Sequence, residues 1–282
     1  SSVKAQLKEL IRIHRNHPSI VVWSMSNEPF FTAPETIDPM RKLLSETVKL
    51  SKQLDPTRPT AIGGAQRPLG EKRIDKLGDI AGYNGDGSYI PEFQQPGIPT
   101  VVSEYGSTTA DRPGEYDPGW GDLAKNNAQN GFAWRSGQAI WCAFDHGSIA
   151  GSALGKMGII DYFRIPKRAW YWYRNAYKGI APPKWPEAGT PARIALTADQ
   201  TNQIKTDGTD DVMLSVTILD ADGKPVNNSP AVSLNIISGP GEFPTGTSIL
   251  FEKESDIRIL DGKAAIEFRS YYAGETVIRA TS

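Results

Sequence analysis

The chain has 282 residues, of which 39% are hydrophobic and 22% are charged, and its formal net charge is −1. This composition is ordinary for a globular protein, and the lack of a basic block or acidic tail disfavours nucleic acid and anionic membranes as partners. The single cysteine, Cys142, excludes an internal disulfide and a cysteine-based metal cluster. No apolar run reaches ~18 residues, the length that a membrane-spanning helix needs.

The first part of the chain alternates predicted helices with predicted strands. Apolar residues at helical spacing predict a helix over 2–15, and the continuous apolar run 20–23 predicts a strand buried on both faces. Asp38 and Pro39 mark the start of a second helix that reaches about residue 53. This alternation predicts a parallel α/β architecture. The remaining predicted elements are strands at 60–63, 79–83, 99–104 and 138–144 and helices at 123–135 and 167–177.

The second part of the chain follows a proline-rich stretch over 181–191, which predicts a stiff linker. Residues 192–282 contain short alternating segments separated by turn signals, and they carry no histidine, cysteine or tryptophan. We therefore predict a β-sandwich of immunoglobulin type that serves as a packing or spacer domain, with accessory carbohydrate binding as the alternative. Its predicted strands are 193–198, 212–219, 232–237, 256–260, 264–268 and 276–280.

Two of the predicted buried strands lead to a glutamate. The stretch RNHPSIVVWSMSNE ends at Glu28, and the stretch PTVVSE ends at Glu104. Parallel α/β proteins carry their chemistry where the strands end, so both carboxyl groups are expected at one rim. Cleavage of a glycosidic bond needs two such groups, a proton donor and a partner that attacks the anomeric carbon or activates water. The pair of glutamates meets this need, and the assignment to glycosidic chemistry is what the following resemblance implies.

These stretches resemble glycoside hydrolase family 2, the group of the β-galactosidases, β-glucuronidases and β-mannosidases. The sequences DPTRP at 55–59 and GIIDYFRIPKRAWYWYR at 158–174 are also similar to segments of that family. The resemblance implies a TIM (β/α)8 barrel, of which residues 1–180 supply strands four to eight as a partial catalytic domain. Half a barrel leaves open sheet edges, so we expect a companion N-terminal segment that supplies the other strands. The region after the linker resembles bacterial immunoglobulin-like domains.

The resemblance assigns the central roles to the two glutamates. It implies a retaining mechanism, with Glu28 as the acid/base and Glu104 as the nucleophile. Asn27, directly before the acid, is expected to donate a hydrogen bond to or accept one from the sugar 2-hydroxyl, a contact that strengthens in the transition state. The alternative for Asn27 is a turn or cap.

Four further residues are expected at the same site. Tyr83 resembles the family tyrosine that orients the nucleophile, and Trp141 resembles the aromatic floor of the sugar subsite; a core position is the alternative for both. Asp145 and His146 follow the last predicted barrel strand and are expected to contact sugar hydroxyls, with capping as the alternative. The three histidines show no metal-ligand spacing, so we expect neither a catalytic metal nor a cofactor.

The implied activity is that of a retaining exo-β-glycosidase acting on an oligosaccharide or polysaccharide. Residues 154–158 lack the Asn-x-Lys pair of the family glucuronidases, and the sequence before the acid differs from that of the mannosidases. A β-galactoside is therefore the preferred substrate, although Ser107 stands where galactosidases usually carry histidine. The alternatives are a non-catalytic carbohydrate-binding or adhesion protein with a degenerate barrel, or another β-glycosidase, including an endo-acting one.

The context of the protein is suggested by its ends and its appended domain. The chain opens directly into a predicted helix without a methionine or a leader, which we interpret as a processed or truncated piece. The immunoglobulin-like domain favours a periplasmic or secreted location in a bacterium. Assembly into a homo-oligomer is left open by the sequence.

Overall fold

The computed structural model describes residues 2–29, 33–85, 90–106, 110–117, 136–147, 154–255 and 257–282. The chain divides into two compact units, the first comprising Ser1–Ser107 and Asp117–Ala143 and the second Thr108–Tyr116 and Phe144–Ser282. This division groups residues 144–180 with the β-rich part of the chain, whereas the sequence predicts a boundary at 181–191.

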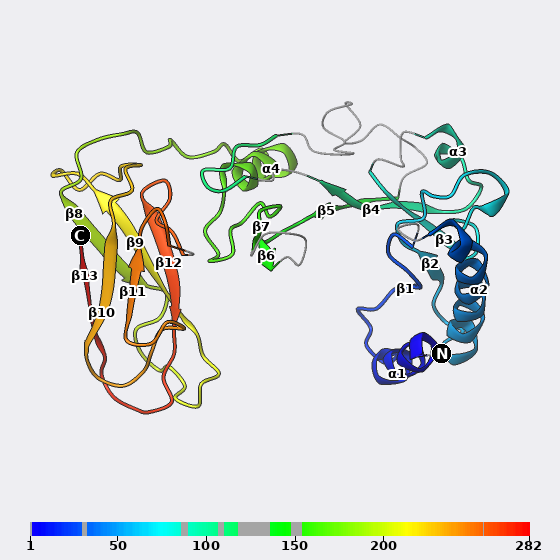
Figure 1. Ribbon diagram of the computed structural model, residues 1–282, viewed down its shortest axis with the longest axis horizontal. Helices are drawn as coiled ribbons and strands as arrows, with labels where there is room; N and C mark the ends of the chain where they lie inside the picture. Colours follow the sequence, from blue (N-terminus) through cyan, green and yellow to red (C-terminus); the bar gives the residue numbers. More distant parts are fainter. Residues whose placement is uncertain are drawn as a thin grey trace. The chain divides into compact units, whose positions relative to one another are not determined.

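The first unit is built on a five-stranded sheet whose strands follow one another in chain order and all run parallel (Figure 1). Helices precede and connect these strands, as in a (β/α) barrel. The predicted partial TIM barrel is therefore confirmed as a curled, parallel half-barrel. The strands are β1 (Trp23–Ser24), β2 (Thr60–Ile62), β3 (Ile80–Asn84), β4 (Thr100–Gly106) and β5 (Gln138–Trp141).

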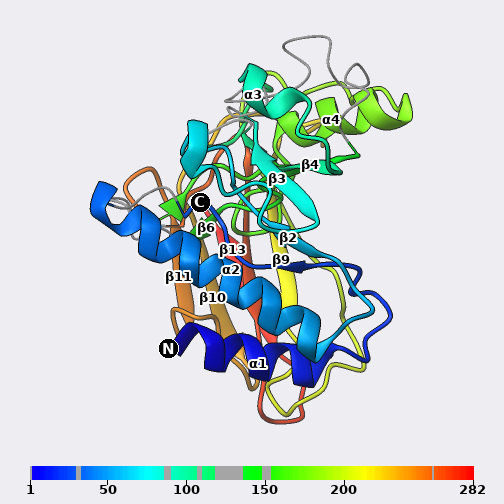
Figure 2. The ribbon, with the colours of Figure 1, turned by 90° about the vertical axis from the view of Figure 1, so that its right-hand side faces the viewer.

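Two long helices lie side by side in Figure 2, and the second of them packs on this sheet. They are α1 (Ser2–His14) and α2 (Ile37–Leu54), and shorter turns lie at η1 (Pro34–Thr36), η2 (Gly70–Lys72) and α3 (Pro91–Gln94). Leu44 and Val48, one helical turn apart, face a core that includes Ile62 and Phe93. Burial of this apolar stripe holds α2 on the sheet. Within the described residues, no helix is both long and apolar enough to cross a membrane.

The strands that lead to the two glutamates differ from their predicted lengths. In the described residues β1 pairs with β2 alone, and Val21, in the run predicted as doubly buried, is 72% exposed. The prediction of burial on both faces was wrong for this run: Trp23 alone is buried, and no neighbouring strand in the described residues covers the edge next to Val21. By contrast, β4 continues two residues beyond Glu104 to Gly106. The predicted helix 123–135 lies outside the described residues.

The β-rich part of the second unit consists of two three-stranded antiparallel sheets. Alternate residues of β9 (Val212–Leu219) are buried, and they share one core with Leu234, Phe251 and Phe268. The immunoglobulin type of this sandwich stays a prediction. One sheet contains β12 (Lys263–Phe268), β9 and β8 (Arg193–Ala198), and the other contains β11 (Ser248–Phe251), β10 (Val232–Ser238) and β13 (Val277–Thr281).

One predicted strand of the sandwich was wrong and another was missed. In place of a strand at 256–260, the described residues 257–260 hold Ile257 and Ile259 against the core without a strand partner. The missed strand is β11, whose Ile249 and Phe251 are buried and which pairs with β10. Alternation reports which side chains are buried, and it cannot report which backbone groups pair.

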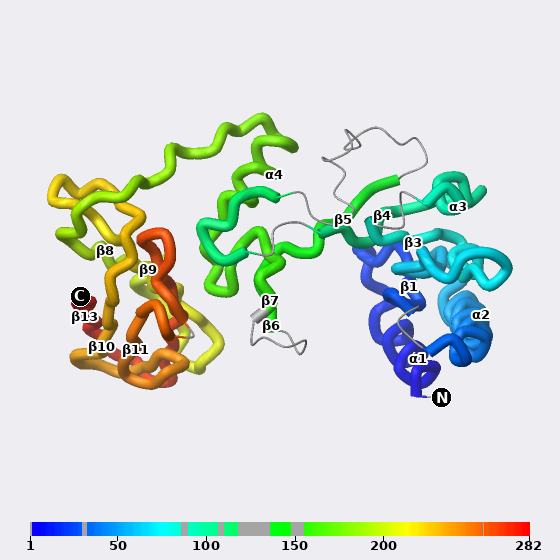
Figure 3. The backbone as a smooth tube through the Cα atoms, turned by 45° about the horizontal axis from the view of Figure 1, so that its top comes forward, coloured from blue at the N-terminus to red at the C-terminus, as the bar shows by residue number. Residues whose placement is uncertain are grey.

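The second unit begins with short elements before the sandwich. The pair β6 (His146–Gly147) and β7 (Leu154–Gly155) is followed by α4 (Arg168–Lys178), which ends at Gly179 with a φ of +65°. Glycine accepts this left-handed conformation without the steric cost that a Cβ brings. The extended linker then leads to β8, as the backbone trace of Figure 3 shows.

Candidate active site

Glu28 lies in a loop after β1 and its backbone is held in an unusual conformation. Its φ is +47°, a region that non-glycine residues rarely adopt and that recurs at functional sites. The loop rests on Gly63 and Gly64, which follow β2: a Cβ at Gly64 would lie 2.8 Å from the Cγ of Glu28. A Cβ at Gly63 would lie 2.5 Å from the carbonyl oxygen of Ser26. Glycine is therefore required at both positions, where the loop that carries Glu28 comes close to the backbone that follows β2.

Asn84, the last residue of β3, holds the side chain of Glu28. Asn84 is fully buried, and its Nδ2 donates a hydrogen bond to Oε1 of Glu28. Its Oδ1 accepts a hydrogen bond of 3.2 Å from the Ser103 hydroxyl, and its backbone N–H donates one of 3.0 Å to Oε1 of Gln66. With these partners the Asn84 amide is held at both ends.

Glu104 lies beside the same asparagine. Asn84 of β3 is the residue registered with Glu104 of β4, and the N–H of Gly85 donates a 2.7 Å hydrogen bond to the carbonyl oxygen of Glu104. The register between β3 and β4 shifts between Tyr83 and Asn84, next to this pair. The register between β4 and β5 shifts between Val102 and Tyr105. Irregularities of this kind re-aim side chains and are common beside active sites. The two glutamates therefore flank Asn84 at one end of the sheet.

Two of the other predicted site residues lie at this end of the sheet. Asn27 directly precedes Glu28 in the loop and is exposed. Trp141 is the last residue of β5, is registered with Gly106 of β4 and is 38% exposed. A partly exposed indole at the same end of the sheet as the two glutamates is a surface on which a sugar ring can stack.

Tyr83 has a different environment. It is fully buried on the face of β3 opposite to Asn84, and its ring centroid lies 4.8 Å from that of Phe93. Its hydroxyl donates a 2.8 Å hydrogen bond to Asp75, which also pairs with Arg73 at 2.6 Å. Burial, with the contact to Asp75, raises the pKa of Tyr83 above its ordinary value. This is the core position that the sequence left as the alternative, and a role in orienting Glu104 stays a prediction.

Asp145 and His146 belong to the second unit. Asp145 is buried, and its Oδ1 accepts hydrogen bonds from Nζ of Lys167 at 2.7 Å and from the N–H of Gly158 at 2.8 Å. Burial raises the pKa of Asp145, while the Lys167 ammonium opposes that rise. These contacts engage Oδ1 inside the second unit, and a contact of Asp145 or His146 with sugar hydroxyls stays a prediction. The His146 ring has its Nδ1 2.8 Å from the carbonyl oxygen of Gly147.

Sequence reasoning missed Asn84, Ser103 and the two glycines. The signal for Asn84 was present, because a polar residue directly follows the predicted strand 79–83. Such a residue reads equally well as a cap or a turn, so its pattern alone indicates no contact. In the described ranges, no group of three or more His, Cys, Asp or Glu residues is placed to hold a metal ion.

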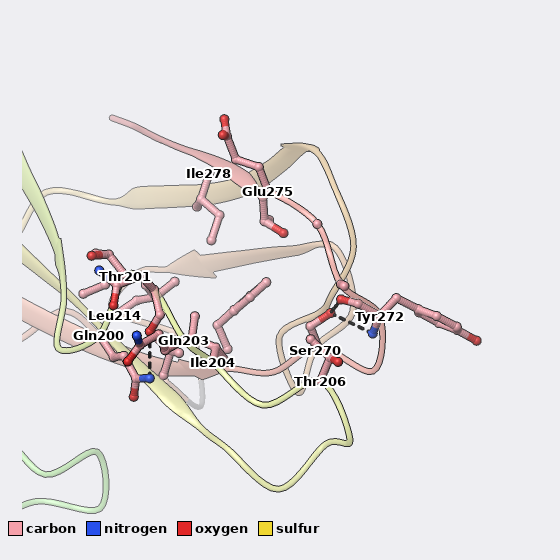
Figure 4. A pocket seen from close by; sticks show the side chains of 17 residues that line it. Gln200, Thr201, Gln203, Ile204, Thr206, Leu214, Ser270, Tyr272, Glu275 and Ile278 are labelled. Carbon is pink, nitrogen blue, oxygen red and sulfur yellow. Dashed lines mark hydrogen bonds between the residues drawn. The ribbon is translucent and has the colours of Figure 1, made fainter.

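A separate hollow of about 370 Å³ lies at one end of the sandwich (Figure 4). Its apolar part includes Ile204, Leu214 and Ile278, and polar side chains such as Thr201 surround it. Tyr272 at its edge is 74% exposed and projects away from it. An apolar floor with a polar rim is the usual composition of a small-ligand site.

The sequence profile described as "Glycosyl hydrolases family 2, TIM barrel domain" matches residues 2–146. Among curated proteins, a beta-glucuronidase of Bacteroides fragilis is 28% identical over 207 residues, covering 61% of this chain and 28% of the relative. A beta-galactosidase of Thermoanaerobacter pseudethanolicus is 30% identical over 192 residues, covering 61% of this chain and 23% of the relative.

Solved structures share the fold. A beta-glycosidase from Bacteroides vulgatus superposes with a TM-score of 0.73 at 18% identity, covering 99% of this chain and 51% of that chain. A family 2 glycosyl hydrolase from Bacteroides cellulosilyticus gives a TM-score of 0.70 at 17% identity. The chain spans less than a third of the two curated relatives and about half of the first solved chain.

Proposed function

Because the chain belongs to glycosyl hydrolase family 2, we propose that the protein is a retaining exo-β-glycosidase with Glu28 as its acid/base and Glu104 as its nucleophile. The observation that carries this proposal is the position of the two glutamates on either side of Asn84 at the carboxyl end of one parallel sheet. That end is where barrel enzymes carry their catalytic residues.

The proposed reaction has two steps. In the first, a carboxylate oxygen of Glu104 attacks the anomeric carbon while Glu28 gives its proton to the leaving oxygen, so a glycosyl ester forms and the aglycone departs. In the second, Glu28 takes a proton from water, the water oxygen attacks the same carbon and Glu104 is released. Asn27, exposed beside the acid, supplies the contact to the 2-hydroxyl, and Trp141 supplies the stacking surface.

A β-galactoside is the substrate that we propose. The curated relatives include both a beta-glucuronidase and a beta-galactosidase, so they do not separate these sugars. Recognition of a glucuronide needs a cation free to pair with the uronic carboxylate. Lys156 is the lysine in the stretch 154–158, and its Nζ lies 2.7 Å from Asp111 in an ion pair. That engagement favours the neutral sugar.

A panel of 4-nitrophenyl β-glycosides tests the proposal on the protein in its full length. We expect the galactoside to give the highest kcat/KM among the galactoside, glucuronide and mannoside. The variant Glu104→Gln should lower kcat at least about a thousandfold, as expected when a covalent nucleophile is lost, with an unchanged circular dichroism spectrum. A preference for the glucuronide would overturn the choice of sugar. Failure of the folded wild-type protein to cleave any member would overturn the glycosidase assignment.

We also propose that a companion N-terminal segment supplies the barrel strands that this chain does not contain. Two observations support it: the chain spans about half of the solved family chain, and β1 pairs with β2 alone in the described residues. An unpaired edge exposes backbone donors and acceptors that a neighbouring strand would satisfy. Val21, exposed in the run before β1, would be covered by the same neighbour.

A second candidate function is carbohydrate binding through the sandwich, favoured by its hollow. Titration of a galacto-oligosaccharide into the Glu104→Gln protein would measure binding without turnover. Binding that persists in that variant and disappears when Thr201→Trp fills the hollow would establish this site. Binding that is unchanged by Thr201→Trp would assign it to the barrel.

A further inference from the structure

Asn84 stands between the two glutamates and has no role in the function proposed above. We propose that Asn84 is a positioning residue, which holds the Glu28 carboxyl group in the orientation needed for proton transfer. The inference rests on the proposed glycosidase function. It adds the residue that sets the geometry of the acid, a group that must lie within hydrogen-bond reach of the leaving oxygen to act.

The first support is a chain of hydrogen bonds with a fixed direction. The N–H of Gly64 donates to Oγ of Ser103 at 3.4 Å, and the Ser103 hydroxyl donates to Oδ1 of Asn84 at 3.2 Å. With Oδ1 occupied as an acceptor, the Asn84 amide presents Nδ2 to Oε1 of Glu28. A backbone N–H can only donate, so it orients each later member of the chain.

The second support is burial. Asn84 is fully buried, as is Gln66, whose side-chain oxygen accepts the Asn84 backbone N–H. A buried amide with its partners in place has one orientation, because turning it would leave polar atoms unsatisfied. Asn84 therefore acts on the reaction through Glu28 and not by touching the sugar.

The third support is the chemistry of the contact. The Asn84 Nδ2 donates a hydrogen bond to one carboxyl oxygen of Glu28, Oε1. The other oxygen, Oε2, is then the one that carries the proton toward the leaving group. A donor at Oε1 also bonds more strongly to a carboxylate than to a neutral acid. It thus favours the charge that develops on Glu28 as the proton departs, and that gain is larger in the transition state than in the ground state.

Leaving-group dependence tests this role. A 2,4-dinitrophenolate departs without protonation, whereas the oxygen of an unsubstituted phenol needs the proton from Glu28. For Asn84→Leu, which keeps the volume and loses the donor, we expect kcat/KM on the phenyl glycoside to fall about 10- to 100-fold, a part of the usual contribution of a general acid. On the dinitrophenyl glycoside of the same sugar, kcat/KM should fall less than about 3-fold.

A matched control separates positioning from a general loss of order. Thr60 is fully buried at the start of β2, and its hydroxyl donates a 2.9 Å hydrogen bond to Oδ2 of Asp79. Thr60→Val also removes one hydrogen bond from the sheet, and it should change kcat/KM on both substrates equally or on neither. If Asn84→Leu does not fold, Ser103→Ala decides the matter, because it removes the donor that orients the amide and should show the same selective loss at smaller size.

The outcomes distinguish this inference from the function on which it rests. Equal losses on both substrates in the Asn84 and Ser103 variants would overturn the positioning role and leave the glycosidase intact. No cleavage of either glycoside by the folded wild-type protein would overturn the proposed function, and the role of Asn84 with it. A selective loss on the phenyl glycoside supports both.

Discussion

Arg112 is the residue whose replacement best tests the cohesion of the second unit. Its side chain is 4% exposed, and its Nε donates to Oδ2 of Asp161 at 2.7 Å. Its two terminal nitrogens donate to the carbonyl oxygens of Leu260 at 2.5 Å and Lys263 at 2.9 Å. One guanidinium therefore joins the segment that follows β4, the region before α4 and the turn before β12.

The variant Arg112→Met keeps much of the apolar stem and removes all three hydrogen bonds. It leaves the Asp161 carboxylate, which is also largely buried, without its cation. Burial lowers the pKa of Arg112 and the Asp161 charge opposes that effect, so the pair bears a desolvation cost that its geometry offsets. Breaking one side of such a pair typically costs about 3–5 kcal/mol, which is the expected loss in the free energy of unfolding.

Urea denaturation followed by circular dichroism measures this loss. Arg112→Lys keeps the charge without the planar fork, so its loss should be intermediate. Asp161→Asn, alone and with Arg112→Met, completes a double-mutant cycle that isolates the coupling between the two side chains. A loss of less than about 1 kcal/mol in the free energy of unfolding of Arg112→Met would refute the reasoning, because a loss that small is typical of an exposed ion pair.

Two further predictions concern the first unit. Hydrogen bonds from Thr57 and Trp23 hold the pKa of Asp55 well below its usual range. The ionised carboxylate therefore stabilises the folded state fully above about pH 4, and this stabilisation is lost as the pH falls through the lower pKa of the folded state. Thermal unfolding of Asp55→Asn should therefore show a lower Tm at pH 7 and a flatter acid limb than the wild type, and parallel limbs would contradict this. Gly64→Ala should lower kcat/KM more than about 10-fold, because its Cβ would displace Glu28. An unchanged kcat/KM would contradict the close packing of Gly64 against Glu28.

The sequence allowed the parallel order of the barrel strands to be predicted, because strands alternate with helices along the chain. It also pointed to Glu28 and Glu104, whose catalytic roles stay a prediction. It could not show that β1 contains two paired residues, since apolar character does not reveal an edge. The ion pair of Asp145 with Lys167 was missed for a related reason, as partners 22 residues apart meet only after folding. A carboxylate after a strand has the same pattern whether it binds a sugar or a buried ammonium.

The position of the proposed acid is set by strands other than its own. β1 contributes two paired residues, and Glu28 lies beyond its end in a loop with a positive φ. The loop instead rests on Gly64 after β2, while Asn84 of β3 holds the carboxyl group and Ser103 of β4 orients the amide. Three neighbouring strands thus share the task, and a change in any of them is expected to affect proton transfer before it affects the binding of the sugar. Within one sheet, the strand that carries the acid can be short because its neighbours supply the precision.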